Sequence, residues 1–215
     1  MPVIIVFLGP SLGRAEAEKI LSAEYRPPVA RGDVTRAMKE GAAIICIIDG
    51  VFHQESAVAH REILLAIHKG IRVIGASSMG ALRAAELDVL GMVGIGEVYR
   101  RYREGNLESD DEVALIFDPS TGLALSEPLV NIRATLQSAE DRGIIDPSTH
   151  TMLLAAARGL YYPERTYPRI CESAGGALSS LVRDAFLRFA KTEPVDVKRK
   201  DAIQALEYIR DQLIP

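Results

Sequence analysis

The sequence predicts an α/β fold, in which an N-terminal, mostly parallel sheet with helices on both faces is followed by a helical C-terminal region. Up to about residue 117, continuous apolar runs alternate with segments of helical periodicity. Such alternation is typical of a parallel sheet covered on both faces. Beyond that point the apolar residues keep helical spacing and β-branched runs are rare. We therefore expect an α/β core over residues 1–117 and helices packed on it over residues 118–215.

The expected elements follow in order along the chain. Uninterrupted apolar runs predict buried strands, and a proline pair predicts one further extended segment, which gives strands at 3–8, 27–30, 42–48 and 71–74. Helical spacing with cap residues predicts helices at 14–23, 33–39 and 56–69, and one from the turn after the last strand to about 90. The second region is expected to hold helices at 128–142, 147–159, 167–171, 177–191 and 200–213.

Composition limits the classes of function. The net charge of −4 gives no electrostatic reason to expect nucleic acid or an anionic membrane as a partner. The longest strictly apolar run, residues 42–48, is too short to span a bilayer, and the N-terminus shows no signal peptide. Cys46 and Cys171 lie far apart, so no disulfide framework is expected and a cytoplasmic location fits. The histidines at positions 53, 60 and 68 lack the spacing of a known ligand set, so no metal is expected.

Four segments with chemical character follow the predicted strands: residues 9–11, 32–33, 49–50 and 77–78. Because the carboxyl ends of parallel strands meet at one edge of a sheet, we expect these segments to converge there. The first has the glycine of a phosphate loop but not its Gly-Lys-Ser/Thr ending, so a nucleotide-binding module is the weakest alternative. Asp49-Gly50 fits a simple turn, or an aspartate that orients a catalytic group.

The most informative segment is residues 75–87, where two serines lie in a small-residue turn between a strand and a helix. This is the layout of a nucleophile elbow, whose helix N-terminus supplies N–H groups for an oxyanion. Ser77 has Gly75 two residues before it and Ser78 has Gly80 two residues after it, but neither has both. A helix N-cap is the alternative interpretation.

A nucleophilic serine needs a base, and no histidine follows it in the order expected of an α/β-hydrolase. A lysine can serve where burial favours its neutral form. Lys198 and Lys200 open the last predicted helix, although a solvated basic turn is the alternative there. Arg83 and Glu86 fit a surface pair, and Asp110-Asp111-Glu112 fits a solvated acidic cap.

Several blocks in order resemble the core of TfuA-like proteins over about residues 3–117, and the last helix resembles the family's C-terminal element more weakly. The blocks are Gly32-Asp33, Ile48-Asp49-Gly50-Val51-Phe52, Val58-Ala59-His60-Arg61-Glu62-Ile63-Leu64, residues 75–87, Gly91-Met92-Val93-Gly94, Asp110-Asp111-Glu112-Val113-Ala114, Val195-Asp196-Val197-Lys198 and Asp201-Ala202. The resemblance implies a partner of YcaO enzymes in peptide-backbone thioamidation, as in the biosynthesis of ribosomally made peptide natural products. It also implies a Ser–Lys hydrolase that takes sulfur, without a cofactor, from the C-terminal thiocarboxylate of a ThiS-like carrier.

Mapped onto this chain, the resemblance favours Ser78 as the nucleophile, because the family often has alanine at the position of Ser77. Lys198 is the first candidate for the lysine and Lys200 the second. Arg61 stands where the family commonly has lysine, and arginine cannot act as a base.

Further site roles follow from this mechanism. We expect oxyanion donors at Met79 and Gly80, orienting roles for Asp49 and His60, and contact with the substrate at Gly75, Ser77 and Arg83. The alternative function is a non-catalytic adaptor that docks the carrier and the peptide substrate onto YcaO.

Overall fold

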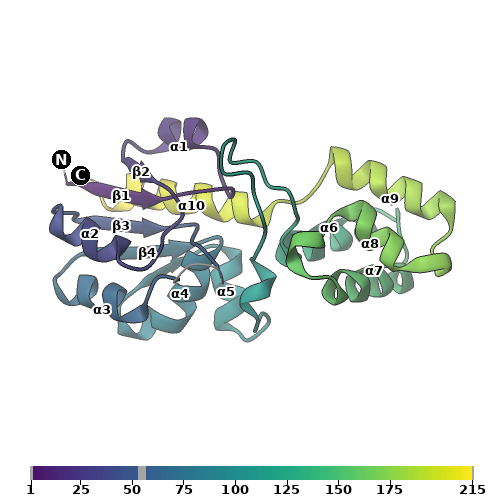
Figure 1. The fold of residues 1–215 in the computed structure, drawn as a ribbon, viewed down its shortest axis with the longest axis horizontal. Helices are drawn as coiled ribbons and strands as arrows, with labels where there is room; N and C mark the ends of the chain where they lie inside the picture. The colour runs from purple at the N-terminus through teal and green to yellow at the C-terminus, as the bar shows by residue number, and fades with distance from the viewer. Residues whose placement is uncertain (1, 53–56, 215) are drawn as a thin grey trace. The chain divides into compact units, whose positions relative to one another are not determined.

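The computed structural model describes residues 2–52 and 57–214, apart from the side chain of Ala177, and it divides into two compact units. Unit 1 comprises the described residues up to Asp110 together with those from Lys198 on, and unit 2 comprises Asp111–Val197. Figure 1 shows the last helix, in yellow, beside the strands of unit 1. The division therefore differs from the expected one in two ways, because the boundary lies before residue 117 and the last helix groups with the N-terminal part.

Unit 1 is built on a parallel five-stranded sheet with the order β2-β1-β3-β4-β5. The strands are β1 (Ile4–Phe7), β2 (Glu24–Arg26), β3 (Ile44–Ile47), β4 (Arg72–Ala76) and β5 (Val93–Ile95). Its helices are α1 (Arg14–Ile20), α2 (Asp33–Lys39), α3 (His60–His68), α4 (Met79–Leu87), η1 (Asp88–Leu90), α5 (Glu97–Arg103) and α10 (Val197–Gln212), which begins at the boundary between the units. The predicted α/β class with a parallel sheet is confirmed.

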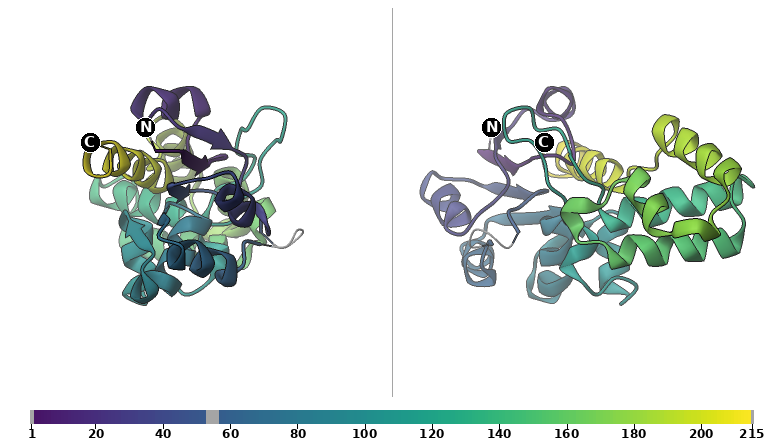
Figure 2. Two further views of the ribbon diagram at one scale, coloured as in Figure 1. Left: turned by 90° about the vertical axis from the view of Figure 1, so that its left-hand side faces the viewer. Right: turned by 45° about the vertical axis from the view of Figure 1, so that its right-hand side comes forward.

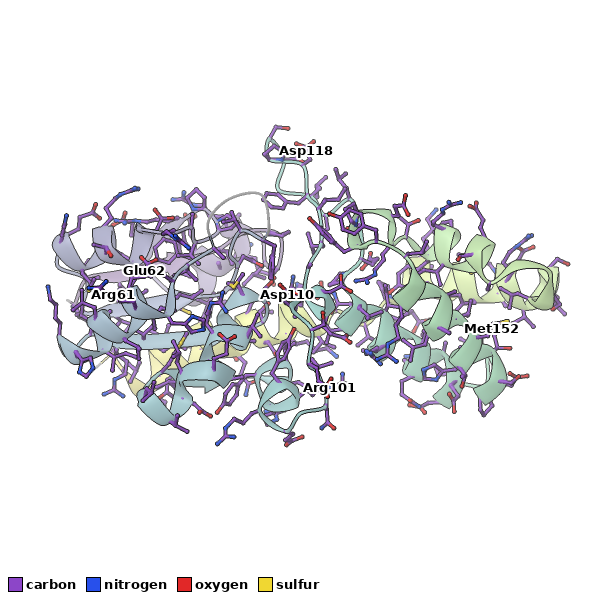
Figure 3. All side chains as sticks on the ribbon, turned by 60° about the horizontal axis from the view of Figure 1, so that its bottom comes forward. Arg61, Glu62, Arg101, Asp110, Asp118 and Met152 are labelled. Carbon is purple, nitrogen blue, oxygen red and sulfur yellow. The ribbon has the colours of Figure 1, made fainter. Side chains whose placement is uncertain are left out.

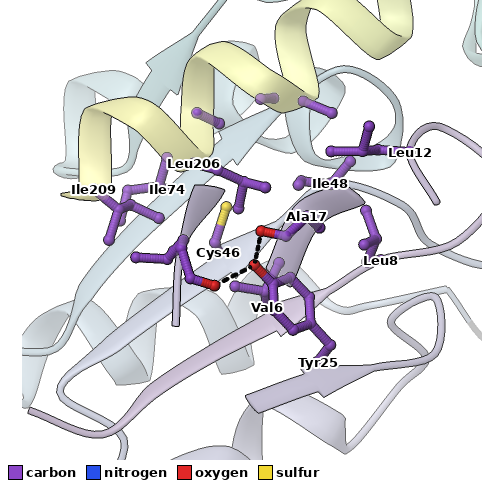
Figure 4. Close-up of a cluster of buried hydrophobic side chains, with 14 of the residues drawn as sticks. Val6, Leu8, Leu12, Ala17, Tyr25, Cys46, Ile48, Ile74, Leu206 and Ile209 are labelled. Carbon is purple, nitrogen blue, oxygen red and sulfur yellow. Dashed lines mark hydrogen bonds between the residues drawn. The ribbon is translucent and has the colours of Figure 1, made fainter. Parts of the chain in front are cut away.

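Both faces of this sheet are covered, which explains why its central strands are apolar without alternation. Successive side chains of a strand point to opposite faces. On one face, Val6, Cys46 and Ile74 pack against α1 and α10 (Figure 4). On the other, Ile5, Ile45 and neighbouring apolar residues pack against α2, α3 and α4. Figure 2 shows the helices lying to either side of the strands.

Two expected elements of unit 1 differ from the structure. The second strand is Glu24–Arg26 and ends before the proline pair, so the range 27–30 was wrong; within it, Val29 forms an isolated bridge with Gly50. The expected strands at 3–8, 42–48 and 71–74 agree with the bounds of β1, β3 and β4 within two residues at each end. The expected helix start at residue 56 lies outside the described residues, and the described helix begins at His60. β5 and α5 had not been expected.

Unit 2 is helical, as predicted. Its elements are α6 (Leu129–Asp141), α7 (Pro147–Gly159), η3 (Tyr162–Glu164), α8 (Tyr167–Ser173), η4 (Gly175–Ala177) and α9 (Ser180–Thr192), and η2 (Asp110–Glu112) lies at its start. Buried side chains such as Ile132, Leu153 and Phe186 form a core of their own. Glu112 is buried and accepts hydrogen bonds from Arg133 at 2.7 and 3.0 Å, so a solvated acidic cap was wrong for this residue. Among the helices that the structure describes, none has the length and apolarity needed to cross a bilayer.

Candidate functional site

The loops that follow β1 and β3 are joined by the carboxylate of Asp49. This residue is 2% exposed, and it accepts hydrogen bonds from the Gly9 and Ser11 N–H groups at 2.8 and 3.2 Å and from Ser11 Oγ at 2.6 Å. The donors that a phosphate would use in the loop after β1 are thus occupied by an internal anion. The structure therefore gives no support to the nucleotide-binding alternative, and it gives Asp49 a role in holding two loops together.

Further strand ends meet at the same edge, as the parallel arrangement predicted. Val29 pairs with Gly50, and its N–H donates to the Asp49 carbonyl at 2.9 Å. A Cβ on Gly50 would lie 2.7 Å from Cγ of Met79, so the turn after β3 touches the first turn of α4. The loop at Gly32 instead contacts Glu62 at the start of α3.

The serine turn between β4 and α4 has an unusual backbone. Ser77 has a φ of +67° and is the only non-glycine residue with a positive φ in the described part of the chain. The Ser78 N–H donates to the Ala76 carbonyl at 2.8 Å, which closes a three-residue turn around Ser77. A turn of this kind with positive φ at its centre is rare and strained. Helix α4 begins two residues later, so the chain makes the sharp strand-to-helix reversal of a nucleophile elbow, centred on Ser77.

The two serine hydroxyls of the turn differ in their surroundings. Ser77 is fully buried, and its Oγ has no hydrogen-bond partner among the residues that the structure describes. Such a buried, unsatisfied hydroxyl is unusual and calls for an explanation in strain or function. Ser78 is 2% exposed and occupies the N-cap position of α4, but its side chain makes no cap hydrogen bond. Strain and an unsatisfied hydroxyl therefore coincide at Ser77, whereas the sequence had favoured Ser78.

Gly75 and Gly80 allow α4 to lie directly on the sheet. A Cβ on Gly80 would stand 1.7 Å from the Ile47 carbonyl oxygen, and one on Gly75 would stand 2.1 Å from the Gly80 carbonyl oxygen. The Gly80 N–H donates to the Ile48 carbonyl at 3.3 Å, so this expected oxyanion donor already has an acceptor. Within the described residues the Met79 N–H has none. Gly75 lies beneath the turn, where the absence of a side chain leaves room for the backbone of α4.

A cavity of about 370 Å³ opens beside the first two turns of α4. Arg83 lines it and is held in place, because its Nε donates to the Val58 carbonyl at 3.3 Å and its Nη1 to Glu86 at 2.7 Å. Nε2 of His60, whose side chain is half exposed, bonds the same carboxylate at 2.7 Å. The other lining residues are Phe52, Ala57, Met79, Leu82, Glu108, Ser109 and Asp110. The structure thus joins His60 to Arg83 through Glu86, and it does not bond His60 to either serine.

The two candidate lysines are distinguished by burial. Lys198, in the first turn of α10, is 2% exposed, whereas Lys200 is exposed. Asp201 lies three residues after Lys198 and therefore on the same face of the helix. It accepts hydrogen bonds from the Glu97 and Val98 N–H groups at 2.8 and 2.7 Å, at the start of α5. The first turn of α10 is thereby fixed beside the carboxyl end of β5.

Asp201 belongs to one of the blocks of the family resemblance, but the sequence assigned it no role, and the structure gives it the role of joining α10 to α5. Burial raises its pKa to about 6 despite the two backbone donors. Position 96 requires glycine to make room for the Asp201 side chain. Its φ is +98°, and a Cβ there would stand 2.2 Å from Cγ of Asp201. No sequence signal links the two positions, which are separated by more than one hundred residues.

Neither metal ligation nor thiol chemistry is supported by the described residues. They contain no group of three histidine, cysteine or acidic side chains able to hold a metal ion, and His53 lies outside them. Both cysteines are buried, and burial raises the pKa of Cys46 to about 12 and that of Cys171 to about 11. Since the thiolate is the reactive form, burial disfavours reactivity at both thiols.

Comparison with known families gives one match. The family model described as TfuA-like protein matches residues 49–166, which is more than half of the 215-residue chain. The matched range contains Asp49, the serine turn and Arg83, and it ends before Lys198. None of the curated proteins matches the chain.

Proposed function

We propose, on the premise that this chain belongs to the TfuA-like protein family, that it hydrolyses the C-terminal thiocarboxylate of a small ThiS-like carrier protein. Family membership associates the chain with YcaO enzymes in peptide-backbone thioamidation. In this scheme the released sulfide supplies YcaO, which acts on the peptide substrate.

The proposal is carried by the coincidence of strain and an unsatisfied hydroxyl at Ser77. A positive φ at a non-glycine residue is unfavourable by about 1–2 kcal/mol, and a buried unsatisfied hydroxyl adds about 1–3 kcal/mol. Features of this kind persist at active sites, where geometry serves chemistry rather than stability. We therefore assign the nucleophile to Ser77 and keep Ser78, which the sequence favoured, as the second candidate.

The proposed reaction is a net hydrolysis without any redox change. Ser77 Oγ attacks the carbonyl carbon of the thiocarboxylate as its proton passes to a base, and the carbon–sulfur bond then breaks. The base returns the proton to the leaving sulfur, so that hydrosulfide (HS⁻) departs and an acyl-serine remains. Water attacks the acyl group by the same proton route, which restores the serine and frees the carrier as a carboxylate, with one proton released to the solvent.

Two groups of unit 1 support the other roles in this reaction. The Met79 N–H, which has no acceptor among the described residues, is the proposed oxyanion donor at the start of α4. Lys198 is the proposed base, because it is buried at the edge of the sheet where Asp201 anchors α10, whereas Lys200 is exposed. Arg61 is exposed and is given no part in the reaction.

Substrate approach is assigned to the cavity beside α4. Met79, which follows the two serines, lines this cavity together with Arg83. Because Arg83 is held by Val58 and Glu86, its guanidinium has a fixed position from which to bind an acyl or thiocarboxylate oxygen of the carrier tail. His60 contributes by bonding Glu86.

The test is sulfide release from a thiocarboxylated ThiS-like carrier by the purified chain alone. Ser77→Ala should lower the rate by about a thousandfold or more, as expected for loss of a nucleophile. Lys198→Met should have a comparable effect, and Lys200→Met should have little. Ser22→Ala, at an exposed serine of unit 1, is the matched control.

Three results would change the proposal. Loss of activity in Ser78→Ala but not in Ser77→Ala would transfer the nucleophile to Ser78. Full activity in both variants would refute serine catalysis. A wild-type chain that releases no sulfide alone, yet binds YcaO and the carrier, would replace the hydrolase by the adaptor.

A further inference from the structure

A second cavity of unit 1, of about 340 Å³, lies between the starts of α2 and α3. Its lining combines apolar surface from Ala59 and Leu65 with the side chains of Arg31 and Arg61. Leu65 is 45% exposed, so part of its apolar surface is open to a ligand in the cavity. No part of the proposed hydrolysis uses these residues.

The walls of this cavity are held together by the carboxylate of Glu62. It accepts hydrogen bonds from the Gly32 N–H at 3.1 Å, the Thr35 N–H at 3.4 Å and the Ala59 N–H at 3.0 Å. One buried side chain thus caps α3 and also joins it to the start of α2. These hydrogen bonds therefore hold together the starts of α2 and α3, which form the walls of the cavity.

Among the described residues that line the cavity, the two arginines stand against a single carboxylate, that of Glu62. The carboxylate of Glu62 is turned inward to backbone N–H groups, and Figure 3 shows it next to Arg61 at the start of α3. Arg31 and Arg61 are exposed, and neither forms an ion pair with any described residue. By contrast, Arg36 on α2 pairs with Asp33 at 3.4 Å, as many arginines of the chain pair with a carboxylate.

We propose that this cavity is a docking site for a short acidic peptide segment of a partner protein, with an apolar side chain between its carboxylates. The two arginines complement carboxylates, which guanidinium groups bind through paired hydrogen bonds. Leu65 and Ala59 complement the apolar side chain. Unlike a phosphate ion, an acidic segment with a central leucine matches both the charge and the apolar floor.

The test uses a fluorescein-labelled peptide, Glu-Asp-Leu-Glu-Asp, whose binding to the full chain is followed by fluorescence anisotropy in 50 mM salt. The double variant Arg31→Gln/Arg61→Gln should weaken binding by about tenfold or more, because both charges facing the peptide are removed. Raising the salt to 500 mM should weaken wild-type binding in the same direction, since exposed charges are screened. A peptide with glycine in place of leucine should bind several-fold less tightly, and so should the variant Leu65→Gln.

The matched control is Arg158→Gln/Arg188→Gln, which removes two exposed arginines of unit 2 and should leave binding unchanged. Equal binding of the uncharged peptide Gln-Asn-Leu-Gln-Asn would overturn the proposal, as would an equal loss in the control variant. Complete displacement of the peptide by 10 mM inorganic phosphate would reduce the site to a general anion site. Tighter binding of single-stranded oligonucleotide, or self-association that the double variant abolishes, would assign the surface to another partner.

Discussion

The strained backbone of Ser77 predicts that glycine is more stable than alanine at this position. Ordinarily the reverse holds, because glycine loses about 0.5–1 kcal/mol more conformational free energy on folding. At a φ of +67°, alanine keeps a strain of about 1–2 kcal/mol that glycine does not have. Ser77→Gly should therefore exceed Ser77→Ala by about 0.5–1 kcal/mol in the free energy of unfolding. Both variants also remove the unsatisfied hydroxyl, so that difference cancels in the comparison.

The matched control lies in the helix that the turn begins. Ala85 is in the interior of α4 with helical neighbours on either side, and Ala85→Gly should be destabilising by about 1 kcal/mol. Glycine in place of alanine is thus expected to raise the free energy of unfolding at position 77 and to lower it at position 85. Relative to wild type, Ser77→Gly should also gain from loss of the unsatisfied hydroxyl, while sulfide release is lost.

Urea unfolding followed by far-UV circular dichroism measures these differences, since the chain has no tryptophan to serve as a fluorescence probe. Both positions belong to unit 1, so the shifts should appear in the transition of that unit. A Ser77→Gly variant that is less stable than Ser77→Ala, measured beside the expected loss in Ala85→Gly, would refute the strain and with it the argument for Ser77 as nucleophile.

Other perturbations of unit 1 have equally definite outcomes under the same urea assay. Gly80→Ala should be destabilising by several kcal/mol, because its Cβ would lie 1.7 Å from a backbone oxygen of β3, whereas Gly13→Ala has open space and should change stability by less than about 1 kcal/mol. Asp49→Ala should be destabilising by about 3 kcal/mol, since it leaves three donors, two of them buried, without their acceptor; a change below about 0.5 kcal/mol would contradict the role assigned to the carboxylate. The pKa of Asp201 is raised by burial from 3.8 to about 6, so the folded state binds more protons than the unfolded state between these values. Wild type should therefore lose about 2 kcal/mol of stability relative to Asp201→Asn as the pH rises from 4 to 6, and a wild type that gains stability relative to Asp201→Asn over this range would contradict the sign.

The parts of the fold that the sequence predicted are those with strong local patterns. β1, β3 and β4 are buried on both faces, so their apolar runs are continuous and unmistakable. β5 contains Gly94 between two half-buried residues, and a three-residue strand of this kind has no readable period. The proline pair predicts an extended segment at 27–30, whereas β2 ends at Arg26, just before the pair. Proline has no N–H to donate to a neighbouring strand, which explains why the strand ends there.

The location of the candidate site could be predicted from the sequence, but the geometry of its side chains and backbone could not. The serine turn, the convergence of strand ends and Lys198 were all visible from residue types and order. The choice between Ser77 and Ser78 was not, because it rests on the positive φ and the unsatisfied hydroxyl of Ser77, which residue types and order do not record. The role of Asp201 depends on hydrogen bonds that span more than one hundred residues, and no local pattern records them.

The sheet order also bears on why the proposed chemistry is placed at the end of β4. In a sheet of order 2-1-3-4-5, the crevice between β1 and β3 is where ligands usually bind, because the loops there diverge to opposite faces. In this chain Asp49 fills that crevice from within and uses the N–H groups of Gly9 and Ser11. An anionic ligand in this crevice would have to displace a buried carboxylate. The next strand end, after β4, carries the strained Ser77, and the proposed reaction is placed there.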